Sequence, residues 1–436
     1  MDSEGTVNMK TRKILMLINF FPPAAGGGVY RPLSFVKYLP GMSWEVTVIT
    51  PGAGEFWISD PSLLKEIPPE VRVVRTGSLS ASRLLNIIRK RKGAERASRS
   101  SGKFEMLRKL GEFALLPDTY VGWVPFAVKA GSGLLSGENF DMIYSTSPPD
   151  STHLAARKLS RRFGIPWVAD FRDPWIGLYL RDPVTPLHRY IHRRLEERTS
   201  RADLVLVTTD WQKDKLLELY PRARVEKIPN GYDSDKFREF EEITPEAGRF
   251  TILHSGMLTL GRRSENFLKG LSMFMRRTGT SAGSIHVIFA GAWESGNREW
   301  VTEFGLEDVV DFVGHLPHRE CIRLERKSHV LLLIKHDDIR YRGLIPGKLY
   351  EYIGARRPVL AVVPDGEAGD IVRSLNRGET AGVAEPGEIA ETIEKLYNLY
   401  RREELDDRYS LEELPRFSRK SEAEQLNVLI RESIGE

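Results

Sequence analysis

Short hydrophobic runs alternate along the chain with longer amphipathic stretches. In the first half these runs are continuously apolar rather than apolar at every second position, which is typical of strands buried on both faces of a parallel sheet. The stretches between them have helical periodicity, and 151–164 ends in Gly164, a residue suited to a helix C-terminus. The strands predicted in this half lie at 13–20 (KILMLINF), 44–50 (WEVTVIT), 141–146 (DMIYST), 166–171 (PWVADF) and 203–209 (DLVLVTT).

A second series of the same kind begins near residue 250. Two consecutive series of alternating strands and helices predict the α/β class, with two Rossmann-like, doubly wound domains. We place the N-terminal domain at 13–230 and the C-terminal domain at 231–414, and we expect residues 1–12 to be a disordered lead-in. The strands predicted in the second half lie at 250–256 (FTILHSG), 284–291 (SIHVIFAG), 309–314 (VVDFVG), 329–336 (HVLLLIKH) and 357–363 (RPVLAVV).

Length and composition agree with two globular domains. A chain of 436 residues exceeds one ordinary hydrophobic core, and 41% hydrophobic with 28% charged residues is typical of a globular protein. The single cysteine, Cys321, excludes an intrachain disulfide and suits a reducing cytoplasm. The first residues lack the apolar core of a signal peptide, and no apolar run reaches the roughly 18 residues of a membrane span. These features predict a cytoplasmic protein.

The net charge of +4 is unevenly distributed. Ten Lys/Arg and two Glu stand between residues 83 and 109, so this segment carries +8 and the remainder about −4. Apolar residues accompany the charges, and the aromatic stretch 121–126 (VGWVPF) follows. Basic residues contribute about 1 kcal/mol each near anionic lipid, and aromatic residues favour the membrane interface. The pattern predicts peripheral contact of 83–126 with an anionic membrane surface, with a solvated insertion as the alternative. No nucleic-acid-binding module accompanies it, so no nucleic-acid partner is expected.

In open parallel sheets, ligands bind beyond the carboxyl ends of the strands. The loop after the first strand, 19–32, contains Gly26, Gly27 and Gly28 just before a predicted helix. Glycines let backbone N–H groups approach a phosphate, and a helix N-terminus favours an anion. The spacing matches neither a P-loop nor G-x-G-x-x-G. A phosphate-binding loop and a plain flexible turn are therefore equal alternatives.

Charged residues follow two further strands. Asp170, Arg172 and Asp173, in DFRDPW (170–175), stand where a strand meets the expected ligand site and could act as base, electrostatic stabiliser or hydroxyl ligand. An internal Arg–Asp pair that fixes the loop is the alternative. In HSGMLTLGRR (254–263), Gly256 is followed by Arg262 and Arg263, and guanidinium groups suit diphosphate oxygens. Paired arginines on a surface helix are the commoner case.

The stretch GLIPGKLYEYIGARRPVLAVV (343–363) places a carboxylate near a helix start. Pro346 marks that start, so the N–H groups of the first turn and Lys348 would face the ligand. Glu351, one turn in, could accept two hydrogen bonds from a vicinal diol such as a ribose. A carboxylate in the first turns also complements the helix dipole without any ligand. Spacing alone leaves both interpretations open.

Taken together, these loops resemble the retaining glycosyltransferases of family four, which have the GT-B fold. The resemblance spans nearly the whole chain and is closest at 145–175, 202–233 and 347–369. It implies two facing domains, of which the N-terminal one takes the acceptor and the C-terminal one the nucleotide-sugar donor. It also implies that the last helix, 418–434, crosses back so that 415–436 pack on the N-terminal domain. The expected donor is a UDP- or GDP-sugar. The expected acceptor is a glycan or lipid-linked molecule, such as a precursor in polysaccharide biosynthesis.

By the same resemblance, Glu351 matches the second Glu of the family's Glu-x7-Glu motif and would grip the nucleotide ribose. Gly27, Gly28 and Gly256 would approach the phosphates, and Arg262 or Arg263 would neutralise the leaving diphosphate. The implied donor-binding set also includes His315, Leu316, Lys348 and Leu349, and the implied catalytic set is Asp173, Arg172 and Arg262.

The sequence departs from this family at the first Glu of the motif. That position is Gly343 here, which puts sugar recognition in question and leaves Lys348 to supply a different contact. The usual acceptor-domain His is not evident either.

The resemblance implies retention at the anomeric carbon by a front-face attack, with no metal and no other cofactor. Asp233 and Asp235, in a D-x-D pattern, lie in the linker and are interpreted as a turn or helix cap. An epimerase or hydrolase of nucleotide sugars on this fold, and a non-catalytic homologue, are the alternatives.

Overall fold

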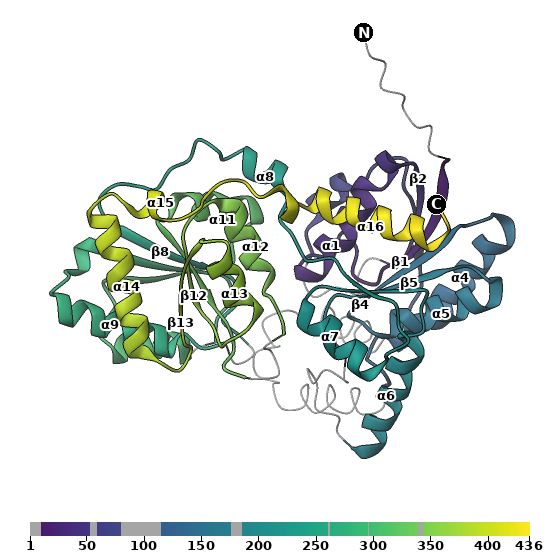
Figure 1. The fold of residues 1–436 in the computed structure, drawn as a ribbon, viewed down its shortest axis with the longest axis horizontal. Coiled ribbons are helices and arrows are strands. Elements are labelled where there is room, and N and C mark those ends of the chain that lie inside the picture. The colour runs from purple at the N-terminus through teal and green to yellow at the C-terminus, as the bar shows by residue number, and fades with distance from the viewer. Residues whose placement is uncertain are drawn as a thin grey trace, which may run out of the picture. The chain divides into compact units, whose positions relative to one another are not determined.

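The computed structural model describes residues 10–52, 59–79, 115–175, 185–259, 262–294, 296–338 and 343–436. The chain divides into two compact units, Met1–Pro229 with Arg419–Glu436, and Asn230–Ser418. Figure 1 shows each unit as a sheet with helices packed on it. Residues 1–9 and most of the basic segment predicted to contact a membrane, 80–114, lie outside the described residues.

The N-terminal unit is built on a parallel sheet in the order β3-β2-β1-β4-β5-β6-β7. β1 is central and pairs in parallel with both β2 and β4, so that Ile14 stands opposite Val46 and Met142. The chain therefore winds outward from β1 in both directions. Its strands are β1 (Arg12–Leu17), β2 (Trp44–Pro51), β3 (Arg72–Thr76), β4 (Met142–Ser147), β5 (Trp167–Phe171), β6 (Leu204–Val207) and β7 (Val225–Lys227).

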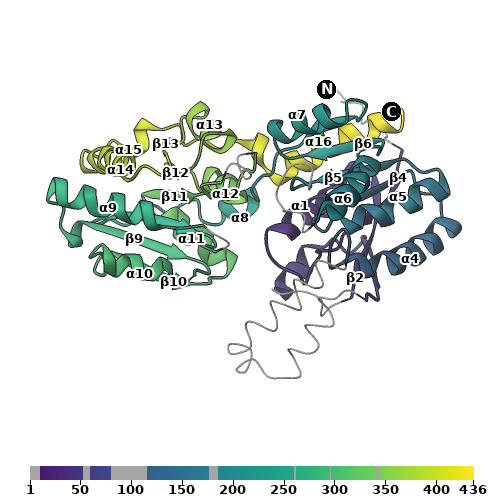
Figure 2. The same ribbon diagram turned by 90° about the horizontal axis from the view of Figure 1, so that it is seen from below.

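Helices cover both faces of this sheet (Figure 2). α1 (Gly27–Tyr38) and the last helix, α16 (Arg419–Ser433), contribute Leu33, Phe35 and Leu426 to the core on one face. α4 (Val124–Gly137) and α5 (Ser151–Phe163) contribute Ala127 and Leu159 to the core on the other. α6 (Pro186–Thr199) and α7 (Asp210–Leu219) complete that second layer. The return of the last helix to the N-terminal unit, implied by the resemblance, is confirmed.

The C-terminal unit repeats the plan with a parallel sheet in the order β10-β9-β8-β11-β12-β13. α9 (Glu265–Thr278), α10 (Gly296–Glu303) and α14 (Pro386–Arg401) pack on one face, and α8 (Ser234–Arg238), α11 (His318–Lys327), α12 (Gly347–Ala355) and α13 (Glu367–Ser374) on the other. α15 (Leu405–Arg408) follows. The strands are β8 (Phe250–Ser255), β9 (Ile285–Ala290), β10 (Val310–Gly314), β11 (Val330–Ile334), β12 (Val359–Val362) and β13 (Gly378–Ala381).

Every strand predicted from a continuous apolar run is present, and the α/β class with two doubly wound units is confirmed. The pattern missed β3, β7 and β13, which lie at sheet edges. Their residues are mostly half-buried or exposed, so they lack the continuous apolar run that marks the central strands. Asp233 stands at the N-cap position of α8, but its side chain accepts no capping hydrogen bond there. No helix among the described residues is long and apolar enough to cross a membrane.

Candidate functional site: charged clusters at the carboxyl ends of the strands

The C-terminal unit places Glu351 within a group of charged side chains. Oε1 of Glu351 lies 3.3 Å from Nε2 of His318, at the start of α11. Oε2 accepts a hydrogen bond from the ammonium of Lys348, one turn earlier in α12, at 2.5 Å. The Glu351 side chain is 13% exposed, so it is largely buried but still reaches the surface. The carboxylate is thus oriented from both sides at the N-terminal half of a helix.

Glu325 is a second carboxylate in this group, and sequence reasoning missed it. It lies in α11 and is fully buried. Its Oε1 accepts a hydrogen bond of 2.5 Å from the hydroxyl of Ser255, the last residue of β8, and lies 3.6 Å from Nζ of Lys348. Its Oε2 has no hydrogen-bond partner among the described residues. Lys348 therefore stands between two carboxylates, one near the surface and one inside.

The two carboxylates experience opposite electrostatic environments. Burial alone would raise the pKa of Glu351, but Lys348 and the hydrogen bond with His318 outweigh it and hold that pKa below its usual range. For Glu325, burial dominates and raises the pKa, with Lys348 opposing and Glu351 reinforcing the shift. Burial would lower the pKa of Lys348, yet Glu351 and Glu325 together raise it well above its ordinary value. Lys348 is thus held as a cation and Glu351 as an anion.

The loop after β8 approaches the next strand closely. The N–H of Gly256 donates to the carbonyl of Ala290 at 2.7 Å. Gly291 has a φ of 139°, and a Cβ there would lie 2.0 Å from the Gly256 carbonyl oxygen. A side chain at Gly291 is therefore excluded on two grounds, conformation and space. This contact fixes the path of the Gly256 loop.

His254, at the end of β8, borders the same loop. Its Nδ1 lies 2.9 Å from the carbonyl oxygen of Leu332 and, as the donor, leaves Nε2 as an acceptor. Nε2 has no partner among the described residues, and a Cβ on Gly256 would lie 3.2 Å from it. Burial lowers the pKa of His254 to about 4, an effect to which Arg262 and Lys348 also contribute. Both cations are therefore within electrostatic range of this histidine.

The two arginines of the loop have different surroundings. Arg262 is half-buried, and its Nη1 lies 3.4 Å from the carbonyl oxygen of Met257. Arg263 is exposed, pairs with Glu265 at 3.2 Å and lies over the ring of Trp300 at 4.8 Å. Arg262 contributes to the lowered pKa of His254, whereas Arg263 contacts Glu265 and Trp300, so the structure distinguishes the two arginines that the sequence left equal.

The remaining predicted donor-site residues lie around the start of α11 and α12. His315 is exposed, and Leu316 is half-buried against the core of the unit. The Leu349 side chain is fully buried in that core, and its N–H donates to the Pro346 carbonyl at 3.0 Å. Gly343, at the place of the missing motif Glu, is buried.

The glycine loop of the N-terminal unit lies against Arg172. Gly26 has a φ of 111°, which favours glycine, and α1 starts at Gly27. A Cβ on Gly28 would lie 2.9 Å from Nη1 of Arg172, whereas a Cβ on Gly27 would meet no atom within 4 Å. Arg172 is 11% exposed, and its Nη2 lies 3.5 Å from Asp173, which is 39% exposed. One guanidinium group is thus placed against the N-terminal turn of α1.

Asp170, at the end of β5, is a structural anchor. The guanidinium of Arg31 donates to both of its carboxylate oxygens, at 3.0 and 3.1 Å. The hydroxyls of Tyr144 and Thr146 donate to Oδ2 at 2.6 and 3.3 Å. Arg31 and Asp170 are both buried, and Nη1 of Arg31 also donates to the Ile228 carbonyl at 3.0 Å. This internal Arg–Asp pair ties α1 to β5, while Arg172 and Asp173 remain beside the loop surface.

Comparison with known proteins agrees with this architecture. Residues 26–231 match the model of the glycosyl transferase 4-like domain. A search of curated protein sequences found no significant match. Sucrose-phosphate synthase from Thermosynechococcus elongatus is similar in structure, with a TM-score of 0.66, 15% identity, and coverage of 97% of this chain and 98% of that one. Anabaena HepE in complex with UDP has a TM-score of 0.61, 14% identity, and coverage of 97% and 100%.

A third similar structure is an α,α-trehalose-phosphate synthase (UDP-forming) from Burkholderia xenovorans in complex with glucose-6-phosphate. Its TM-score is 0.64 with 12% identity, and the match covers 96% of this chain and 100% of that one. These structures share the two-domain GT-B fold of the chain. The match to the glycosyl transferase 4-like domain covers residues 26–231, which is most of the N-terminal unit.

Proposed function

We propose that the protein is a retaining, hexosyltransferase-like enzyme that moves a sugar from a nucleotide-sugar donor to an acceptor. The observation that carries this proposal is the Glu351 carboxylate, held as an anion by Lys348 and His318 beside the N-terminus of α12. An oriented, charged carboxylate is a strong acceptor for two vicinal hydroxyls. We assign it to the ribose of the donor, and UDP is the first nucleotide to test because the similar Anabaena protein binds UDP.

Two cations are available for the diphosphate. Lys348 lies at the N-terminus of α12, and Arg262 follows β8 through the Gly256 loop. When the bond between the anomeric carbon and the phosphate oxygen breaks, negative charge develops on the diphosphate, and cations and helix N-termini stabilise it. The acceptor oxygen forms the new bond to the anomeric carbon. In the front-face route its proton passes to the leaving phosphate, so the route requires no protein nucleophile and no metal.

Gly343 stands where the family's motif has its first Glu, and the charged group around Lys348 suggests what replaces that carboxylate. Glu325 and Glu351 together hold Lys348 in place. We infer that the Lys348 ammonium takes over a contact to the donor sugar or its phosphate that a carboxylate makes in other members. A cation there would favour a donor with an anionic group or a phosphate oxygen at that position.

The acceptor side is assigned to the N-terminal unit. Arg172 lies against the glycine loop, and Asp173 is exposed next to it. Asp173 would orient the acceptor hydroxyl, and Arg172 with the N–H groups at Gly27 and Gly28 would hold an anionic group. A cytoplasmic enzyme that acts on a glycan or lipid-linked acceptor, peripheral at the membrane through 83–126, is the setting we propose.

The first experiment is a thermal-shift screen of UDP, GDP and their sugar conjugates, followed by measurement of nucleotide release with candidate acceptors. A glycosyltransferase should bind one donor and release nucleotide only when acceptor is present. Turnover of the donor without acceptor would favour an epimerase or hydrolase. Absence of any nucleotide binding would contradict the proposal, and binding without turnover across the acceptor panel would favour a non-catalytic homologue.

A further inference from the structure

The outer surface of α5 and α6 in the N-terminal unit is strongly basic. Residues 151–163 and 186–201 contain nine Lys/Arg and two Glu, a net charge of +7 on a chain whose total is +4. One of the two acids, Glu196, is buried and accepts a hydrogen bond from the hydroxyl of Tyr220. The other acid in these two ranges, Glu197, is partly exposed and pairs with Arg194 and Arg201 at 3.1 and 2.7 Å.

Guanidinium groups crowd one another on this surface. Burial and the neighbouring charges of Arg161, Arg198 and Arg201 lower the pKa of Arg157. Arg157 and Arg161 belong to α5, whereas Arg198 and Arg201 lie at the end of α6 and just beyond it. The two helices therefore contribute to one positively charged surface. Like charges held together repel, and an anionic partner would remove that repulsion.

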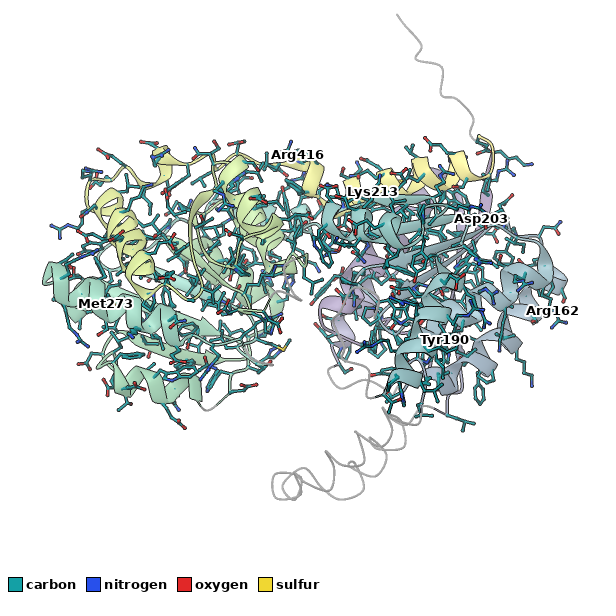
Figure 3. All side chains as sticks on the ribbon, turned by 60° about the horizontal axis from the view of Figure 1, so that its bottom comes forward. Arg162, Tyr190, Asp203, Lys213, Met273 and Arg416 are labelled. Carbon is teal, nitrogen blue, oxygen red and sulfur yellow. The ribbon has the colours of Figure 1, made fainter. Side chains whose placement is uncertain are left out.

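The start of α6 adds two large apolar side chains to the charge. Leu187 is 63% exposed and Tyr190 is 61% exposed. They are three residues apart in one helix and therefore lie on the same face (Tyr190 is labelled in Figure 3). Arg189, Arg193 and Arg194 are exposed around them. An isolated exposed leucine needs no explanation, but an apolar pair set among arginines does.

We propose that this surface, the α6 tip (Leu187, Arg189, Tyr190, Arg193 and Arg194), docks the N-terminal unit on an anionic lipid bilayer. Leu187 and Tyr190 enter the interface, and the arginines meet the headgroup phosphates.

A bilayer fits both halves of the surface. The spread negative charge of anionic headgroups matches basic residues distributed over two helices. The boundary between headgroups and acyl chains accommodates a leucine and an amphipathic tyrosine. A nucleic acid would use the charge and stack on the tyrosine but leave the leucine in water. The α6 tip is distinct from the segment 83–126, and its role does not depend on the proposed transfer reaction.

The test is co-flotation of the full-length protein with phosphatidylcholine vesicles and with mixed phosphatidylcholine–phosphatidylglycerol vesicles. We expect binding to the mixed vesicles only, weakened by high salt because the Debye length shrinks. The variant Leu187→Ser/Tyr190→Ser should reduce the partition coefficient roughly tenfold or more, since two apolar side chains lose their insertion. Arg189→Gln/Arg193→Gln should reduce it by at least roughly tenfold, from about 1 kcal/mol for each basic residue.

A control variant removes one basic and one apolar side chain from an exposed helix face elsewhere. Met273, 42% exposed, and Lys269 lie on the outer face of α9 in the C-terminal unit, and Lys269→Gln/Met273→Ser should leave vesicle binding unchanged. Thermal midpoints in the presence and absence of UDP show whether each variant is folded and binds nucleotide, so a failure of the proposed enzyme function is recognised separately.

Three results would overturn the proposal. The first is no binding to anionic vesicles. The second is full binding by both α6 variants, which would place any membrane contact elsewhere, for example in 83–126. The third is binding to a single-stranded oligonucleotide, abolished by the arginine variant, without binding to vesicles.

Discussion

The ammonium of Lys348 lies 2.5 Å from Oε2 of Glu351, three residues further along the same helix. The pair keeps Glu351 charged and fixed in a position close to the surface. Because hydrogen bonds to a charged group contribute about 1.5–3 kcal/mol, loss of this charge should be visible in ligand affinity.

We therefore expect Glu351→Gln to weaken UDP binding by roughly tenfold or more while preserving side-chain volume. Isothermal titration calorimetry measures the affinity, and the thermal midpoint of the unliganded protein shows that the fold is retained. Glu320→Gln, on the exposed side of α11, is the matched control and should bind UDP normally. Equal affinity of Glu351→Gln and the control would refute the ribose assignment.

Lys348 separates two carboxylates, and its removal should destabilise the C-terminal unit. In Lys348→Met, Glu325 and Glu351 lose their shared cation, and we expect a loss of roughly 3–5 kcal/mol in the free energy of unfolding. Adding Glu325→Gln should recover part of the lost free energy of unfolding, because the buried carboxylate that Lys348 would otherwise neutralise is removed as well. Urea unfolding of the single and double variants measures the coupling, and simple additivity would contradict the shared role of Lys348.

Two adjacent glycines provide a matched pair at the N-terminal loop. Gly28→Ala places a methyl group 2.9 Å from the Arg172 guanidinium and must displace it, whereas Gly27→Ala meets nothing within 4 Å. We expect Gly28→Ala to lower kcat/KM at least roughly tenfold, because small displacements of a positioned group are costly to catalysis. Gly27→Ala keeps the backbone N–H and meets no protein atom, so it should retain activity. If Gly28→Ala also retains full activity, the role assigned to Arg172 is wrong.

Asp170 and Asp173, three residues apart, should respond differently to the same change. Asp170→Asn leaves the buried Arg31 without its ion pair, and we expect a loss of about 3 kcal/mol or more in the free energy of unfolding. Asp173 is partly exposed, so Asp173→Asn should leave stability within about 0.5 kcal/mol and lower turnover instead. Denaturant unfolding and nucleotide release separate the two effects. A large loss of stability in Asp173→Asn would make it a structural residue.

Acid should destabilise the protein through its buried histidines. Burial is the largest cause that lowers the pKa of His153 to about 3 and those of His254 and His329 to about 4, from an ordinary value near 6.5. Between about pH 4 and pH 6.5 the unfolded chain therefore binds more protons than the folded one, and stability falls as the pH falls. Each histidine contributes at most about 1.4 kcal/mol per pH unit.

Thermal midpoints measured from pH 7 down to pH 4.5 test this dependence. The depressed pKa of Glu351 acts in the same direction, because the stability that it contributes above about pH 4.5 is lost as the pH falls further. His254→Asn, whose amide could still donate to the Leu332 carbonyl, should flatten the profile. An unchanged slope in that variant would show that His254 is protonated in the folded state at these pH values.

The fold followed from the sequence because central parallel strands are buried on both faces and are therefore rich in apolar residues, as β1 and β11 show. The edge strands β3, β7 and β13 escaped detection because most of their residues are half-buried or exposed, so they lack a continuous apolar run. Glu351 was accessible to sequence reasoning through its place after a helix start. Glu325 was not, because a Glu on an amphipathic helix resembles any surface residue until the tertiary fold buries it against Ser255.

The same limit applies to Arg31 and Asp170. They stand 139 positions apart, and no local pattern shows that a carboxylate at the end of buried strand β5 pairs with an arginine of the distant helix α1. Sequence patterns indicate which residues are buried. The partner of a buried charge depends on which distant elements the fold brings together.

The last helix has a consequence for how the protein is made. Ala423, Leu426 and Ile430 of α16 fill the core beneath α1, and Asn427 accepts a hydrogen bond from the Trp44 indole at 2.8 Å. During translation, the face of the N-terminal sheet that α16 covers therefore stays partly exposed until the whole C-terminal unit has been synthesised. The N-terminal unit is therefore completed only after the C-terminal unit. A chaperone that binds the uncovered apolar surface beside α1 would protect it during that interval.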